Sequence, residues 1–198
     1  LQDLDAYLEG ALAAWGVPQL AIGVMQNEAV LLQRGYGARR ADQPGAVDEH
    51  TSFAIASLSK GFTAALVALL VERGQLAFDD PVQRHLPEFA VADAQVSREL
   101  TLRDLLAHRS GLQPEVDALW AFTGYQRPQL LERLRFAGQA APVRSQFTYQ
   151  NVHYLVAGEA LARRGGRSWS KLLRRELLQP LRMSDSATTL REHSARPN

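Results

Sequence analysis

The stretch FAIASLSKGFTAALVALLVERG, residues 53–74, contains the longest apolar run of the chain, residues 62–71, and ends at a glycine. Between Phe53 and Val71 the only charged residue is Lys60. A helix that is apolar nearly all round is normally buried, and a membrane span needs about 20 apolar residues. We therefore expect a buried core helix that ends at Gly74, and no membrane span.

Within this stretch Ser57 precedes Lys60 by three residues, so one helical turn places an amine beside a hydroxyl. Buried lysines are rare unless they are paired or functional, and free N–H groups at a helix start help to bind an oxyanion. This Ser-x-x-Lys spacing is typical of hydrolases with a nucleophilic serine. The residues alone leave a structural interpretation open, in which Ser57 is an N-cap and Lys60 extends into solvent.

The same pattern occurs a second time, at Ser168 and Lys171. Here one apolar helix face is formed by Trp169, Leu172, Leu173 and Leu177, and Lys171 lies on the opposite face. Ser168 follows two glycines and an arginine, which is the position of an ordinary N-cap. We therefore interpret this second pair as structural.

The remaining pattern predicts one domain, residues 1–198, with an N-terminal helix and hairpin in 1–56 and a nucleophile helix and helical region in 57–198. The hairpin strands are 19–26 and 29–37, and a loop rich in Asp, Pro and Gly covers 41–51. Further helices are expected over 102–108, 128–136, 151–164 and 169–178. Because two strands make only a marginal sheet, we expect a C-terminal portion or a second chain to complete it.

Composition excludes several functional classes. The chain has 22 basic and 21 acidic residues, so no overall charge favours nucleic acid, and it has no cysteine for thiol chemistry. Its five histidines lack the close spacing of metal ligands, and no G-x-S-x-G nucleophile elbow is present. We expect a small-molecule or peptide substrate and neither a metal nor an organic cofactor.

Four segments, 34–89, 101–112, 147–161 and 177–186, resemble the serine beta-lactamase and penicillin-binding-protein-like superfamily. The similarity is greatest to class C beta-lactamases and related esterases and D-aminopeptidases. It implies an α+β fold, in which helices flank an antiparallel sheet beside a mostly helical subdomain, with the C-terminal strands missing from this chain.

The resemblance also implies a site. Ser57 matches the acylated serine and Lys60 the lysine one turn later, while Tyr149 and Asn151 match the Tyr-x-Asn motif. A phenol has a pKa near 10, so Tyr149 can take the serine proton only where a cation such as Lys60 lowers that pKa. Asn151 can donate and accept, which suits an acyl side-chain amide. By residue type alone, Tyr149 is equally a packing aromatic and Asn151 an N-cap.

The implied function is a serine hydrolase that acts through an acyl-enzyme on a beta-lactam, a D-alanyl peptide or amide, or a small ester. The family suggests a periplasmic or secreted location. A third family motif, Lys-Thr-Gly or His-x-Gly, is not found, since Arg109–Gly111 precedes Tyr149, and His108 beside it is expected to be structural. Losing one oxyanion donor costs about 10²–10³ in rate, so we expect residues 1–198 alone to be nearly inactive and poorly folded. The alternative is a penicillin-binding or sensing module whose Ser57 is acylated without turnover.

Overall fold

The computed structural model describes residues 3–40 and 43–194. Two compact units divide the chain, one formed by the residues up to Ala54 with those from Asp185 onward, the other by Ile55–Ser184. The division predicted from the sequence falls after residue 56, two residues later than the observed one. The prediction also assigned the residues from Asp185 onward to the helical part. Helices combined with a small antiparallel sheet confirm the predicted α+β class.

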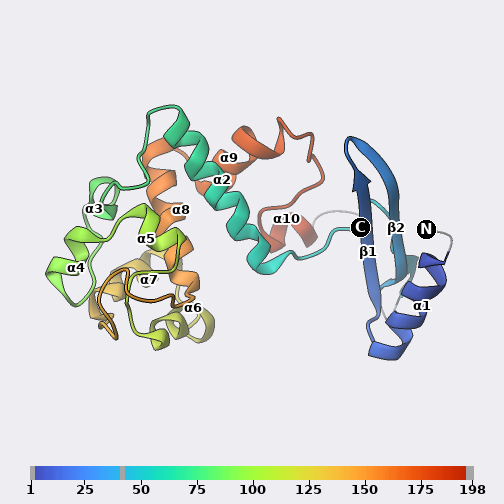
Figure 1. The fold of residues 1–198 in the computed structure, drawn as a ribbon, viewed down its shortest axis with the longest axis horizontal. Helices are drawn as coiled ribbons and strands as arrows, with labels where there is room; N and C mark the ends of the chain where they lie inside the picture. Colours follow the sequence, from blue (N-terminus) through green and yellow to red (C-terminus); the bar gives the residue numbers. More distant parts are fainter. Residues whose placement is uncertain (1–2, 41–42, 195–198) are drawn as a thin grey trace. The chain divides into compact units, whose positions relative to one another are not determined.

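The first unit contains the sheet, whose strand order is β1-β2-β3. Its elements are α1 (Leu4–Trp15), β1 (Gln19–Gln26), β2 (Ala29–Arg40), β3 (Gln43–Ala46) and α10 (Leu190–Ser194). The turn between β1 and β2 has Asn27 at φ 54°, which asparagine tolerates better than most residues. The predicted N-terminal helix and the predicted hairpin are thus both confirmed (Figure 1).

The prediction of only two strands was wrong, because β3 forms inside the segment expected to be a loop and pairs antiparallel with β2. Proline and glycine are depleted in strands, so Gln43–Ala46 gave no strand signal. An edge strand accommodates them because one of its sides needs no ladder hydrogen bonds.

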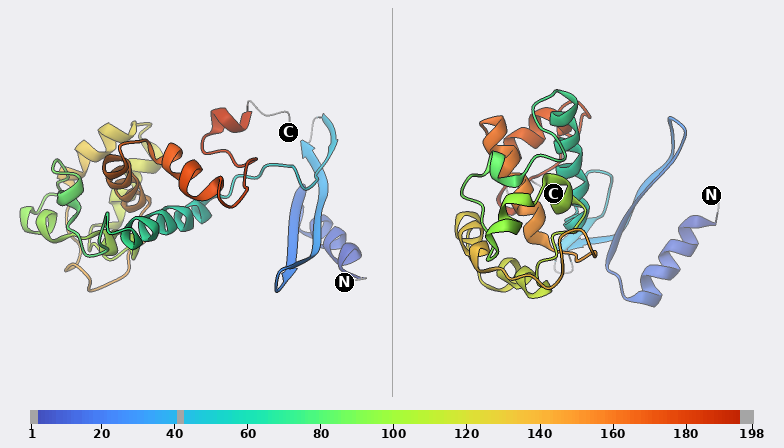
Figure 2. Two further views of the ribbon diagram at one scale, coloured as in Figure 1. Left: turned by 90° about the horizontal axis from the view of Figure 1, so that it is seen from above. Right: turned by 60° about the vertical axis from the view of Figure 1, so that its left-hand side comes forward.

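The second unit is helical (Figures 1 and 2). Its α-helices are α2 (Ser59–Glu72), α3 (Val82–His85), α4 (Ala94–Glu99), α5 (Leu102–Leu106), α6 (Ala118–Phe122), α7 (Arg127–Arg133), α8 (Asn151–Gly165) and α9 (Trp169–Leu173). Short 3₁₀ turns are η1 (Ala56–Leu58), η2 (Pro114–Asp117) and η3 (Leu134–Phe136), and η4 (Arg174–Leu178) is a π-helical turn. No helix in the described ranges is both long and apolar enough to cross a membrane.

Helix α8 is central to this unit, because it packs against α2, α3, α5, α7 and α9. Its buried face follows helical spacing, with Val152, Val156 and Ala160 each no more than 1% exposed. The Trp169 ring of α9 lies against Gly158 of α8, and its indole N–H donates to Thr63 on α2 at 3.1 Å. Trp169 thus links α2, α8 and α9.

Within the helical unit, α2 buries Thr63, Leu66, Val67 and Leu70. Their spacing places them on one face of the helix, which belongs to the core of this unit. The helix begins later than expected, since Ser57 lies in the preceding 3₁₀ turn.

Two predicted helix starts are confirmed. Thr101 and Asp104 form a reciprocal capping box at α5. Ser168 caps α9 by accepting from the Lys171 N–H at 3.4 Å, and Lys171 itself is exposed. The second Ser-x-x-Lys pair is therefore structural, as its polar helix face predicted.

Candidate active site

Ser57 lies at the entrance to α2 in an unusual backbone setting. The preceding residue, Ala56, has φ 45°, a left-handed conformation that costs a non-glycine residue about 1–2 kcal/mol. Ser57 then occupies the middle of a 3₁₀ turn, and its side chain is exposed. Lys60 follows as the second residue of α2 and is half-buried. One turn thus separates the hydroxyl from the amine, as predicted from the spacing.

The polar ends of Ser57, Lys60 and Tyr149 meet in a triangle. Ser57 Oγ lies 2.6 Å from the Tyr149 hydroxyl, and Lys60 Nζ donates to Ser57 Oγ at 3.1 Å. Lys60 Nζ also donates to the Tyr149 hydroxyl at 2.5 Å. Because all three sides are hydrogen-bond distances, a proton on Ser57 can reach the phenol directly.

Asn151 is the first residue of α8, and its Oδ1 accepts from Lys60 Nζ at 2.6 Å. An ammonium has three donors, and Ser57, Tyr149 and Asn151 accept one each. The Lys60 cation also lies 4.7 Å from the Tyr149 ring centroid. All four residues singled out in the sequence are therefore brought together by the fold.

The electrostatics of the triangle favour an ionised phenol. The hydrogen bond from Lys60, followed by the one with Ser57, lowers the pKa of Tyr149 below its ordinary value, although desolvation and Asp117 act in the opposite direction. Tyr149 is 43% exposed, and its hydroxyl is held by Ser57 and Lys60. A tyrosine with a lowered pKa beside a serine hydroxyl is arranged to act as a base.

His108 holds the segment that carries Tyr149. Its carbonyl accepts from the Thr148 N–H at 2.8 Å, and its Nδ1 accepts from the Gln150 N–H at 3.2 Å. These bonds flank Tyr149 on both sides, and the two rings stack with centroids 4.6 Å apart. His108 is buried and makes no direct hydrogen bond to Ser57 among the contacts described. The expectation of a structural role fits these contacts.

Behind His108 lies a buried hydrogen-bonded chain. His153 Nδ1 is 3.2 Å from His108 Nδ1, and His153 Nε2 is 2.8 Å from the Ser110 hydroxyl. Since His108 Nδ1 already accepts from Gln150, it must be the acceptor toward His153 as well. Burial, with a smaller effect of the His108 ring, lowers the pKa of His153 to about 3. Burial and the Lys60 cation lower the pKa of His108 too, so both rings are neutral.

One contributor was missed in the sequence. Asp117, the last residue of η2, accepts from the backbone N–H groups of Asn151 and Val152 and from the Asn151 side-chain amide. An aspartate directly before a helix is ordinarily that helix's own N-cap, but Asp117 makes no cap bond to α6. The only available signal was an acidic residue preceding α6, and this does not identify a partner 34 residues away.

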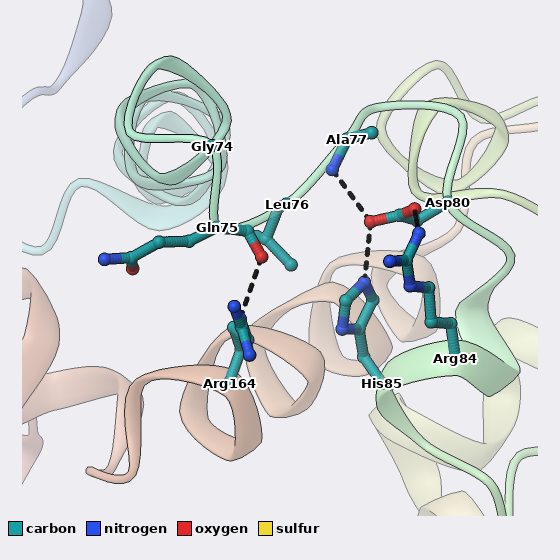
Figure 3. A pocket seen from close by; sticks show the side chains of 8 residues that line it. All are labelled: Gly74, Gln75, Leu76, Ala77, Asp80, Arg84, His85 and Arg164. Atoms are coloured by element: carbon teal, nitrogen blue, oxygen red, sulfur yellow. Dashed lines mark hydrogen bonds and ion pairs between the residues drawn. The ribbon is translucent and has the colours of Figure 1, made fainter.

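A separate polar pocket of about 300 Å³ lies at the other end of α2 and contains none of the four site residues (Figure 3). Asp80 is 5% exposed there and is held by Ala77, Arg84 and His85. Arg164 donates to the Gln75 carbonyl at 2.8 Å. Because these groups satisfy one another's hydrogen bonds, we interpret the pocket as a structural contact that anchors the chain after α2.

Comparison with known proteins decides the family. The sequence profile described as Beta-lactamase matches residues 4–197, nearly the whole chain. The chain belongs to the beta-lactamase family. By sequence, it is 28% identical to unguisins hydrolase of Aspergillus violaceofuscus, over 96% of this chain and 35% of that protein. The chain spans well under half the length of the curated relatives that it matches.

Solved structures show the same fold. A class C beta-lactamase superposes with a TM-score of 0.80 at 22% identity, covering 93% of this chain and 49% of that one. The D-amino acid amidase of Ochrobactrum anthropi gives a TM-score of 0.74 at 26% identity, covering 92% and 51%. Membership of this family of serine hydrolases supports hydrolytic chemistry at the coarse level predicted from the sequence.

Proposed function

We propose that this protein is a serine hydrolase that forms an acyl-enzyme on Ser57. The observation that carries the proposal is the triangle of Ser57 Oγ, Lys60 Nζ and the Tyr149 hydroxyl, with sides of 2.6, 3.1 and 2.5 Å. A nucleophile within hydrogen-bond reach of a base, itself held by a third group, is the arrangement that serine acylation requires. The roles of these three residues follow from these contacts.

In the proposed acylation, ionised Tyr149 takes the proton of Ser57 as Ser57 Oγ bonds to the substrate carbonyl carbon. The carbonyl electron pair moves to oxygen, and backbone N–H groups at the start of α2 help to stabilise that charge. As the tetrahedral species collapses, the bond to the leaving group breaks and the leaving nitrogen or oxygen takes the proton from Tyr149. Lys60 Nζ donates to the Tyr149 oxygen and stabilises the phenolate each time it forms.

Deacylation repeats the same steps with water. Tyr149 takes a proton from a water molecule as the oxygen of that water attacks the ester carbonyl. This step requires that water reach the hydroxyl of Tyr149, a residue that is 43% exposed. When the tetrahedral species collapses, the bond to Ser57 Oγ breaks and Ser57 takes the proton from Tyr149. The product is a carboxylic acid, and the enzyme returns to its starting protonation.

The substrate class we propose is an acyl compound with a reactive or amide carbonyl: a beta-lactam, a D-alanyl peptide or amide, or a small ester. The similarity to a D-amino acid amidase supports amides within that class. The Asn151 amide binds Lys60 through its oxygen and Asp117 through one N–H, which leaves its second N–H to donate to an acyl side chain. A periplasmic or secreted location belongs to the proposal and rests on the family.

The test is covalent labelling of the protein, expressed at its natural length, with a fluorophosphonate probe. We expect one adduct on Ser57, which Ser57→Ala abolishes. Ser168→Ala is the matched control, because Ser168 stands in the other Ser-x-x-Lys pair but caps a helix. Labelling that persists in Ser57→Ala contradicts the proposal.

Turnover separates the enzyme from a module that only binds. After brief exposure to a penicillin, the intact mass of the protein is followed over time. Loss of the adduct with release of hydrolysed product indicates the hydrolase. An adduct on Ser57 that persists indicates the penicillin-binding or sensing module instead.

A further inference from the structure

The two carboxylate oxygens of Asp117 accept hydrogen bonds from different groups at the start of α8. Its Oδ1 accepts from the backbone N–H of Asn151 and, at 3.2 Å, from that of Val152, so it caps the start of α8 from a different element. Its Oδ2 accepts from Asn151 Nδ2 at 2.7 Å. One side chain on η2 therefore holds both the backbone and the side chain of a predicted site residue.

The second contact determines which way the Asn151 amide faces. An ionised carboxylate only accepts, so the NH₂ end of Asn151 must face Asp117. The carbonyl end is then left toward Lys60, where Oδ1 accepts from Nζ at 2.6 Å. In the reversed orientation the NH₂ group would face an ammonium, and two donors would oppose each other. The contact with Asp117 thus selects the orientation that holds Lys60.

We propose that Asp117 is a positioning residue for the reaction at Ser57, which acts by fixing the amide of Asn151 so that its oxygen orients Lys60. This inference rests on the proposed function. Asp117 touches neither Ser57 nor Tyr149 through a described hydrogen bond. Apart from its electrostatic effect on the pKa of Tyr149, it reaches the site along the path Asp117, Asn151, Lys60. Lys60 in turn contacts both reacting hydroxyls.

The informative variant is Asp117→Asn. Asparagine caps helices about as well as aspartate, so the backbone contacts to α8 are retained. Its side-chain NH₂ group, however, meets the NH₂ group of Asn151 and drives that amide to flip. We expect fluorophosphonate labelling of Ser57 to slow by about tenfold or more, with the urea midpoint of unfolding nearly unchanged.

The double variant Asp117→Asn with Asn151→Asp restores the pattern of donors and acceptors. The new carboxylate at 151 accepts from Lys60 and from the new amide at 117, and the net charge of the pair is unchanged. We expect it to recover most of the lost rate, a rescue that a merely structural role for Asp117 does not predict. Glu115→Gln, at an exposed acid of the same turn, is the matched control and should label at the native rate.

The possible results distinguish a failure of the positioning role of Asp117 from a failure of the proposed acylation of Ser57. Slow labelling of Asp117→Asn with recovery in the double variant supports the positioning role. Labelling of Asp117→Asn within about twofold of the native rate, or a loss that the double variant does not recover, overturns it. Native protein that fails to label at Ser57 overturns the proposed function and this inference together. If Asp117→Asn does not fold, Asp117→Ser replaces it, because serine also caps but is too short to hold the Asn151 amide.

Discussion

Acidification tests the buried histidine chain that supports Tyr149. His153 is 1% exposed, and its pKa is lowered from 6.5 to about 3 by burial and by His108. Below pH 6.5 the unfolded chain therefore binds a proton at this residue that the native protein does not bind. Unfolding is favoured as the pH falls, and the stability lost lies between pH 6.5 and pH 3.

The magnitude follows from linkage. Each pH unit within that window costs about 1.4 kcal/mol for one such group, so His153 alone should cost about 2.5 kcal/mol between pH 7 and pH 4.5. The lowered pKa of His108 adds to this cost in the native protein. Carboxylates contribute little above pH 4.5, because their unfolded pKa values lie near 4.

The assay is the free energy of unfolding from urea titrations at pH 7 and pH 4.5. In His153→Gln the difference between the two pH values should shrink by about 2.5 kcal/mol relative to the native protein. His50→Gln, at an exposed histidine, controls for the loss of an imidazole as such. If the native protein and His153→Gln lose the same stability on acidification, His153 is not held neutral in the core and the reasoning fails.

Two further changes test the site and the turn beside it. Lys60→Gln removes the hydrogen bond that lowers the Tyr149 pKa, so that pKa should rise and the pH profile of Ser57 labelling should move to higher pH. Lys171→Gln, on the exposed face of α9, should leave the profile unchanged. Gly111→Ala should destabilise by at least about 1 kcal/mol in urea unfolding, since Gly111 has φ 73° and an added Cβ would lie 2.2 Å from the Ala141 carbonyl oxygen. Gly61→Ala, where a Cβ meets nothing within 4 Å, should show no such loss.

The parts of the site that depend on local spacing were predictable. Ser57 and Lys60 are one helical turn apart, and the lack of other charges around Lys60 distinguished them from Ser168 and Lys171. Helix starts such as that of α5 were predictable for the same reason, because a capping box is contained in four residues. Tyr149 and Asn151 needed the resemblance, since nothing local ties them to a serine about 90 residues earlier.

The features that the sequence did not predict depend on partners that are distant in the sequence. Asp117 caps α8 instead of the helix that follows it, and which N–H groups a carboxylate meets is set by tertiary packing. Strand β3 contains proline and glycine and forms because β2 offers it a partner. The pairing of His108 with His153 joins α8 to the turn after α5, and neither residue's local pattern indicates it.

The central claim is tested most directly by trapping the acyl-enzyme. The protein at its natural length is mixed with nitrophenyl acetate, quenched in acid within one turnover, digested and analysed by mass spectrometry. We expect an acetyl group on the peptide containing Ser57, absent from Ser57→Ala and present in Ser168→Ala. Hydrolysis that proceeds equally in Ser57→Ala, or an acetyl group found only on another residue, would contradict the account.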